Sequence, residues 1–396
     1  MFDAMARQTA RGLLGIVVAS LTACAAPTSI PAQPPSPAPA AKTPAATPAP
    51  ATPVPAPVPA PAPARQAPIR PAILWPVTKI QGSDYVDVQA IAKAFDLKAA
   101  WTKPASTLTL SDAQGVRFTF EANQKDFYFD RLRVFLGVPP LRQKDTLWIS
   151  KLDVIKIVAP LCRPASHAAL LPPEAPKLIV IDPGHGGIDP GTQNEKLKLN
   201  EKTFALDVAQ RLGKLLEARG WKVALVRETD TELSKDKKAD LLMRSEFANR
   251  RKADLYLSIH FNSAGPNVSG VETYSLTPQH MLSAGALQPD DMTKVAFPGN
   301  RLDYANILLG ESLHRAMIAR LKSSDRGYKH ARHAVLRMLD CPGALVECAY
   351  LSNEAEARRV ATPEFRQAIA ESLATGVQNY AAALATLRPP PPPPEK

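Results

Sequence analysis

The sequence predicts an α/β fold in which a mostly parallel sheet flanked by helices follows a small α+β domain and a disordered Pro/Ala-rich linker. Three observations support this. Near-continuous apolar runs, such as Lys177–Ile181 and Asp254–His260, alternate with segments of helical periodicity, which is typical of a sheet covered on both faces. Residues 71–165 instead show shorter, alternating strands. Residues 25–70 carry almost no charge and no periodic apolar pattern, so they cannot bury a core.

The composition excludes several classes of protein. The 396 residues include 40 prolines and only 19 glycines, without the Gly-X-Y period of collagen. Four cysteines are too few for a fold that depends on disulfides. The formal net charge of +11 favours an anionic partner, but it does not choose among nucleic acid, lipid head groups and an acidic cell-wall polymer.

Residues 1–24 predict a secretory signal peptide. Arg7 and Arg11 precede the apolar run Leu13–Ala23, which is about 11 residues long and too short to span a bilayer. The run ends in Leu-Thr-Ala-Cys, which resembles the lipobox of bacterial lipoproteins and implies acylation of Cys24. Ala25 resembles an outer-membrane sorting signal. The alternative is an ordinary signal peptide with a cysteine nearby by chance.

The linker, residues 25–70, predicts a spacer between membrane and protein. Alternating Pro and Ala favour polyproline II, which advances about 3.1 Å per residue and gives a reach on the order of 100 Å. Such a reach suits an enzyme that is fixed to a membrane while its polymeric substrate lies some distance away. The second proline-rich stretch, residues 387–396, predicts a disordered tail.

Residues 71–165 predict a small α+β domain. Apolar positions in Tyr85–Phe95 have helical spacing, and the other expected elements are strands at Thr107–Leu110, Val116–Phe120, Phe127–Phe129, Arg133–Leu136 and Leu147–Ser150, with a last helix at Leu152–Val158. The segment resembles the stalk-like domain named after the N-terminus of copper amine oxidases. Because the first 166 residues contain no histidine, the resemblance implies no copper site. Targeting or spacing is the expected role, and peptidoglycan binding stays open.

Residues 177–386 predict a larger domain of alternating strands and helices. Asn200 begins an amphipathic helix that Gly220 ends. The other expected helices are Lys238–Arg251, Tyr304–Leu321 and Pro363–Leu384, and the expected strands are Lys177–Ile181, Lys222–Arg227, Asp254–His260, Val271–Leu276, His333–Arg337 and Ala344–Tyr350. In such sheets, ligands collect at the carboxyl ends of the strands.

That rule makes two histidines candidates for a metal site. His185 and His260 both lie at or just past the carboxyl end of an apolar strand, and Glu201 lies in the first turn of the helix that follows the His185 loop. Two imidazoles and a carboxylate with one open position form the ligand set of a catalytic zinc site. No HExxH helix is present, which excludes a thermolysin-type enzyme. The alternative is that both are hydrogen-bonded loop histidines.

Five blocks of sequence follow one another along this domain: Asp182–Gly187, Asn200–Lys202, Ser258–Asn262, Asp325–Gly327 and Val346–Asn353. Together they resemble the zinc-dependent N-acetylmuramoyl-L-alanine amidases. The resemblance implies one Zn²⁺ ion held by His185, Glu201 and His260, with Glu347 as the catalytic carboxylate. It also implies peptidoglycan as the partner and no nucleic acid, and with acylated Cys24 a periplasmic enzyme anchored to the outer membrane.

Other residues support weaker expectations. Asn262 and Arg337 lie near predicted strand ends where they could contact substrate or make local hydrogen bonds. His330 and His333 have a spacing that could suit a second metal, but an exposed basic loop is favoured. The stretch Thr277–Asn300 reads as a lid or a surface loop without an inhibitory helix. Cys341 and Cys348 flank a strand too long for a mutual disulfide, and pairing of Cys162 with either stays open.

Two other functions remain compatible with the sequence. A lipid-anchored wall-binding protein that has lost activity is one, although all four expected site residues are present. A zinc peptidase that cuts another cell-wall amide is the second, because the metal site does not define the leaving group. The sequence is silent on the stem peptide preferred, on any protein activator and on oligomeric state.

Overall fold

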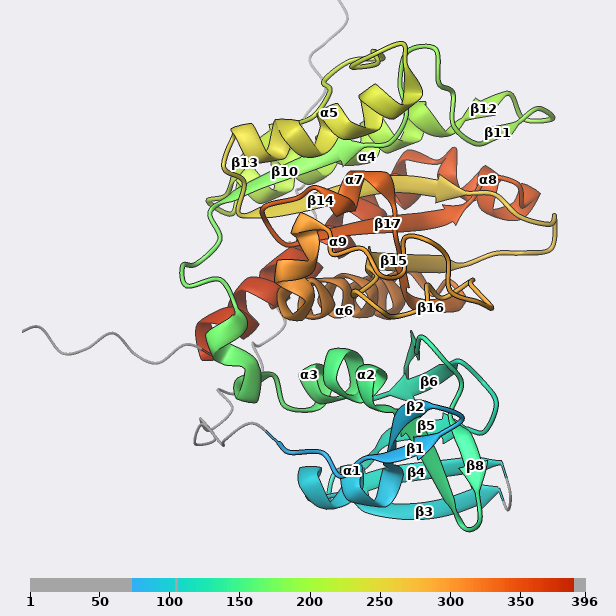
Figure 1. The fold of residues 1–396 in the computed structure, drawn as a ribbon. Coiled ribbons are helices and arrows are strands. Elements are labelled where there is room, and N and C mark those ends of the chain that lie inside the picture. The colour runs from blue at the N-terminus through green and yellow to red at the C-terminus, as the bar shows by residue number, and fades with distance from the viewer. Residues whose placement is uncertain (1–72, 104–105, 388–396) are drawn as a thin grey trace, which may run out of the picture. The chain divides into compact units, whose positions relative to one another are not determined.

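The computed structural model describes residues 73–103 and 106–387 (Figure 1). The predicted signal peptide with Cys24, the linker and all but the first residue of the tail lie outside the described residues, so the expectations about them stay predictions. Among the helices that are described, none is both long enough and apolar enough to cross a membrane.

The first part of the described chain is built mainly from antiparallel strands. Its strands are β1 (Thr78–Ile80), β2 (Ser83–Asp87), β3 (Lys98–Lys103), β4 (Thr107–Asp112), β5 (Gly115–Glu121), β6 (Asp126–Phe129), β7 (Leu132–Phe135), β8 (Leu141–Gln143) and β9 (Thr146–Ser150). Four of them form a sheet in the order β1-β2-β9-β8, and β3 to β7 pair each with the next. The short helices are α1 (Val88–Phe95), α2 (Lys151–Asp153), η1 (Val154–Val158), α3 (Ala159–Cys162) and η2 (Pro164–Leu170).

Helix α1 begins later than the periodicity predicted. Asp87 accepts a hydrogen bond from the backbone N–H of Gln89, at 2.8 Å, and so caps the helix. The residues before it pair with β9, where Tyr85 lies opposite Ser150. The predicted helix over Tyr85–Phe95 is therefore a strand end followed by a helix.

The second part contributes six neighbouring strands, in the order β13-β10-β14-β17-β15-β16, to the larger sheet, which continues from β16 into β7. Its strands are β10 (Leu178–Pro183), β13 (Lys222–Leu225), β14 (Leu255–Asn262), β15 (Val271–Leu276), β16 (Asp325–Ala331) and β17 (Gly343–Tyr350), with a small hairpin of β11 (Gln193–Asn194) and β12 (Leu199–Asn200). Its helices are α4 (Glu201–Glu217), α5 (Lys237–Arg250), η3 (Pro298–Leu302), α6 (Asp303–Leu321), α7 (Ala334–Arg337), α8 (Glu354–Val360) and α9 (Pro363–Leu387).

Both faces of the central strands are covered, which explains why these strands are apolar throughout. Ile179 and Ile181 belong to an apolar cluster with residues of α4, α6 and α9, whereas Val180 between them belongs to a second cluster with residues of α5 and α7. On β14, Tyr256 faces the second cluster. His260 is four residues further along the same strand and so shares that face, at its carboxyl end.

The sheet is mixed, so the prediction of a mostly parallel sheet is wrong. β15 runs antiparallel to β17. Residues 263–270 connect β14 to β15 without a helix. The chain therefore does not return to the edge where β14 began, and β15 starts at the edge where β14 ends. A single parallel pair, Tyr328 with Val134, connects β16 to β7, and the strands β7 to β3 are antiparallel.

One predicted strand does not form, and the strand that precedes it in the sequence was not predicted. Residues 334–337 form helix α7, not a strand over His333–Arg337. The strand is β16, whose sequence Asp-Arg-Gly-Tyr-Lys-His-Ala shows no apolar alternation. This segment forms a strand because it pairs with β15. Such a tertiary contact leaves no signal in the local sequence. The thiols of Cys162, Cys341 and Cys348 are all free.

Candidate active site

The loop that carries His185 is held by two buried arginines. Arg244 donates to the backbone oxygen of His185 at 2.8 Å and to the Asp182 carboxylate at 2.8 Å, and Arg227 donates to the oxygen of Gly184 at 2.9 Å. A β-carbon on Gly184 would lie 2.3 Å from the His260 ring, so only glycine fits there. The glycine and the arginines therefore fix where His185 sits.

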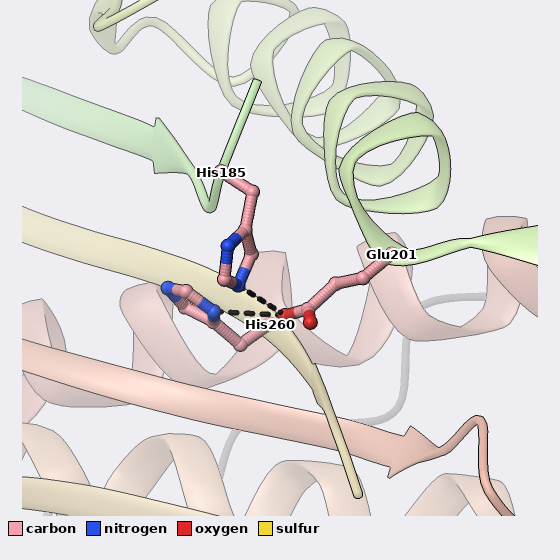
Figure 2. A group of neighbouring side chains, drawn as sticks. All are labelled: His185, Glu201 and His260. Carbon is pink, nitrogen blue, oxygen red and sulfur yellow. Dashed lines mark hydrogen bonds and ion pairs between the residues drawn. The ribbon is translucent and has the colours of Figure 1, made fainter. Parts of the chain in front are cut away.

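The three predicted metal ligands meet at one point (Figure 2). His185 comes from the loop after β10, Glu201 from the first turn of α4 and His260 from β14. Glu201 Oε1 lies 3.1 Å from His185 Nε2 and 2.9 Å from His260 Nδ1. Each residue offers a ligand atom, and these atoms all lie within 4.8 Å of one another. The donor set, two imidazoles and one carboxylate, fits a divalent metal of the zinc type.

The charges within this cluster favour ionised Glu201. Burial opposes its ionisation, but hydrogen bonds from His185 and His260 overcome burial and hold the pKa of Glu201 well below its usual range. Burial would also lower the pKa of His185, yet Glu201 and Asp189 raise it. Asp189 Oδ2 lies 2.8 Å from His185 Nδ1 and so orients the ring.

Glu347 lies beside the cluster, on the neighbouring strand. It pairs with His260 across the β14–β17 ladder and with Glu272 across the β17–β15 ladder. Its Oε2 atom is buried and has no hydrogen-bond partner among the described residues. Burial and the charges of Glu201 and Glu272 raise the pKa of Glu347 well above its usual value. A carboxyl group in this position is suited to hold and transfer a proton.

Asn262 and Arg337 stay predictions as substrate contacts, and the structure gives each of them local partners. Asn262 donates to Glu272 at 3.1 Å and lies 3.3 Å from the Tyr350 hydroxyl, one strand away from Glu347. Arg337 lies on α7, where its guanidinium packs over the Phe297 ring and lies 3.9 Å from the Met292 sulfur. The structure therefore gives Arg337 a role in packing against the Thr277–Asn300 segment. That segment contains no α-helix, and its only regular element is the start of η3.

The prediction that His330 and His333 form an exposed basic loop is wrong. His330 is only 3% exposed, and neither of its ring nitrogens has a hydrogen-bond partner among the described residues. The Nε2 atom of His333 is likewise buried and unpartnered there. Within the described chain, neither residue belongs to a group of three ligands that could hold a metal.

Several residues of the site were missed from the sequence. No local signal predicts that Glu272 belongs to the site, because it lies opposite Glu347 only through the antiparallel pairing of β15 with β17. Arg227 and Arg244 act through backbone oxygens of the His185 loop, a contact that no spacing rule predicts. Asp189 was the one accessible signal, since it lies four residues after His185 in the same loop.

Comparison with known proteins defines the class. The family described as Amidase_3, N-acetylmuramoyl-L-alanine amidase, matches residues 179–379. This match covers half of the chain and includes all four predicted site residues, and the chain belongs to that family.

Among its relatives, the chain is 33% identical over 238 residues to the N-acetylmuramoyl-L-alanine amidase AmiC of Escherichia coli O6:H1, covering 54% of this chain and 55% of AmiC. It is 31% identical over 205 residues to an uncharacterized cell wall amidase of Bacillus anthracis, covering 52% of this chain and 35% of that protein. The chain thus spans between a third and just over half the length of these relatives.

Among solved structures, the N-acetylmuramoyl-L-alanine amidase from Clostridium difficile 630 is 26% identical, with 53% of this chain and 99% of that chain covered and a TM-score of 0.42. The catalytic domain of CwlV, an amidase from Bacillus (Paenibacillus) polymyxa var. colistinus, is 28% identical, with 52% and 97% covered and a TM-score of 0.42.

Proposed function

We propose that the protein hydrolyses the amide bond between N-acetylmuramic acid and L-alanine in peptidoglycan. The observation that carries the proposal is the convergence of His185, Glu201 and His260 beside Glu347 at one sheet edge, in a chain of the amidase family. We propose Zn²⁺ as the metal that the three ligands hold. When bound, Zn²⁺ supplies Lewis acidity that activates water and polarises the amide carbonyl.

The residues of this chain supply the proton transfer. Beside a bound divalent cation Glu347 would be ionised, and it would then accept a proton from the attacking water and donate it to the nitrogen of the departing L-alanine. Its Oε2 atom is available for both steps because no described residue hydrogen-bonds to it. Glu201 is committed to the two histidines and to the backbone N–H groups of Thr192 and Phe261, so it cannot take this role.

The location of the enzyme is also a proposal. Acylated Cys24 would anchor the protein in the outer membrane, and residues 25–70 would let the catalytic part reach the cell wall. Support comes from the lipobox-like sequence alone. Replacing Cys24 with Ala should move the protein from the detergent phase to the aqueous phase on Triton X-114 partition. An unchanged partition would contradict acylation.

The activity is tested by digesting purified sacculi with the zinc-loaded protein and identifying the products by mass spectrometry. Intact stem peptides that begin with L-alanine, together with peptide-free glycan, are expected. Cleavage inside the peptides would instead support a peptidase, and no release at all would support a wall-binding protein without activity.

The control variant is Glu347→Gln. It should keep one zinc per chain and the wild-type fold, but lose at least about 10³-fold in rate, because the amide cannot accept the proton. Turnover near that of the wild type would show that another group carries the proton.

A further inference from the structure

A second polar cluster lies on the same sheet, next to Glu347. At its centre is Glu272 of β15, which is only 3% exposed. We call it the Glu272 cluster, and its other members all contact the Glu272 carboxylate: Asn262, Tyr274, Arg326, Lys329 and Tyr350. The mechanism described above uses none of these side chains.

The cluster continues a row of polar residues that starts at the metal ligands. His260 pairs with Glu347, and Glu347 pairs with Glu272. On the next strand, Arg326 and Gly327 lie opposite Glu272, between the pairs Val271 with Asp325 and Thr273 with Tyr328. Neighbouring strands are about 4.8 Å apart, so the backbone of Arg326 lies roughly 14 Å from that of His260. The Arg326 side chain reaches back to Glu272, whose strand lies roughly 10 Å from that of His260. An extended peptide advances about 3.3 Å per residue, so it spans that distance at about its third residue, and a side chain on its second residue can cover the remaining few Å.

Glu272 does not need Arg326 as a partner. Its two oxygens accept from the hydroxyls of Tyr350 at 2.6 Å and Tyr274 at 2.5 Å. Lys329 Nζ adds a bond at 2.6 Å and Asn262 Nδ2 one at 3.1 Å. Those four donors fill the roughly four acceptor sites of a carboxylate. Arg326 Nε, at 3.1 Å, is a fifth donor.

The free edge of Arg326 is the feature that points to a ligand. Only Nε is used, toward Glu272 and, at 3.0 Å, toward the Tyr350 hydroxyl. Nη1 and Nη2 make no hydrogen bond to any residue in the described ranges, and the side chain is 36% exposed. Two cations against one carboxylate leave the cluster with a net positive charge. A guanidinium fixed at Nε with its terminal nitrogens free can bind a carboxylate with two parallel hydrogen bonds.

We propose that Arg326, oriented by Glu272 and Tyr350, binds a carboxylate of the substrate's stem peptide at the second or third residue from the cleaved bond. This inference rests on the proposed amidase activity. The carboxylate belongs to the peptide and not to the glycan, because the lactyl carboxyl group of the sugar is itself engaged in the cleaved amide. Arg326 is thus a specificity residue that selects acidic over amidated peptides.

The test uses soluble muramoyl peptides in matched pairs, with a free carboxylate or a carboxamide at residue two and, in a second pair, at residue three. We expect the zinc-loaded wild type to prefer the carboxylate in one of the pairs by about 10- to 100-fold in kcat/KM, as for a hydrogen bond to a charged group. The pair that responds identifies which residue is bound. Equal cleavage of both members in both pairs would overturn the proposal.

Variants test whether Arg326 is responsible. Arg326→Gln should lose the preference, lowering kcat/KM on the acidic member only, and Arg326→Lys should keep part of it because the charge remains but the fork is lost. Both should retain one zinc per chain. Arg301→Gln is the matched control, since Arg301 is an exposed arginine paired with Asp340. An equal loss on both members would assign Arg326 a purely structural role.

The two proposals can fail separately. If the wild type cleaves the muramoyl peptides without regard to the carboxylates, the amidase activity stands and the Arg326 site is wrong. If it releases no peptide beginning with L-alanine from any of them while sacculi are also left intact, both are wrong.

Discussion

The molecule contains two pairs of histidines, each partly or fully buried, that differ in their partners. His185 and His260 both contact the Glu201 carboxylate, and His185 also contacts Asp189. His330 and His333 lie close together in sequence, yet their unpartnered ring nitrogens reach no carboxylate among the described residues. The nearby carboxylates raise the pKa of His185 against the effect of burial, whereas burial alone brings the pKa of His330 to about 4.

The difference shows what makes a histidine pair a metal site. Sequence spacing favours the wrong pair, since residues three apart on a helix or turn can share a ligand. The pair that can bind a metal is distant in sequence and brought together by the ends of β10 and β14, with Glu201 supplied by α4. Carboxylates supplied by the fold, and not histidine spacing, mark the candidate metal site.

The sharpest test of this comparison removes one histidine from each pair. His260→Ala should reduce the zinc content from one per chain to near zero after dialysis and lower the rate of sacculus digestion by at least about 10³-fold, because the ligand set is broken. His333→Ala should still hold one zinc. Metal content is measured by plasma mass spectrometry. A second zinc in the wild type that His333→Ala loses would give the other pair a metal role after all.

The same contrast explains how much of the site could be predicted. His185 and His260 were found because both follow apolar strands, and the carboxyl ends of parallel strands meet at one edge. Glu201 was also predicted, from its place in the first turn of the helix after the His185 loop, and Glu347 was predicted only through resemblance to the amidase family. For the two histidines and Glu201, local sequence and sheet topology agree.

The parts that were not predicted depend on which strands become neighbours. β15 pairs with β17 and β16 without any local sign of it, so neither the place of Glu272 beside Glu347 nor that of Arg326 beside Glu272 could be predicted in advance. His330 looked exposed because Lys329 and Arg332 flank it, but β16 buries it between its neighbours. Polar strands of this kind are stabilised by tertiary pairing and lack the hydrophobic alternation that identifies a strand in sequence.

The second prediction concerns stability in acid. The pKa of His330 is about 4 in the folded protein and about 6.5 when unfolded, so between these values the unfolded state binds the additional proton. Stability present above pH 6.5 is therefore lost as the pH falls toward 4, by up to about 3 kcal/mol from this residue. The free energy of unfolding, measured with urea at pH 7 and at pH 5, should fall less between the two pH values for His330→Leu than for the wild type.

Loss of zinc in acid affects the wild type and His330→Leu equally. The difference between their losses of stability is therefore due to His330. The pKa of His333, the other histidine of this pair, is also lowered to about 4, chiefly by burial. The free energy of unfolding of the double variant, His330→Leu with His333→Leu, should therefore fall still less. Equal losses for the wild type and His330→Leu would mean that His330 finds a partner for its charged form.

The smallest expected effect comes from the contact that orients a metal ligand. Asp189→Asn removes the negative charge 2.8 Å from His185 Nδ1, and partners of metal-binding histidines typically contribute 10- to 100-fold to metal affinity. We expect zinc affinity, measured by competition with a chromophoric chelator, to fall within that range while the fold is kept. Asp291→Asn, the same change at an exposed position, should leave affinity unchanged. If both variants bind zinc as the wild type does, Glu201 alone distinguishes the metal-binding pair of histidines from the other.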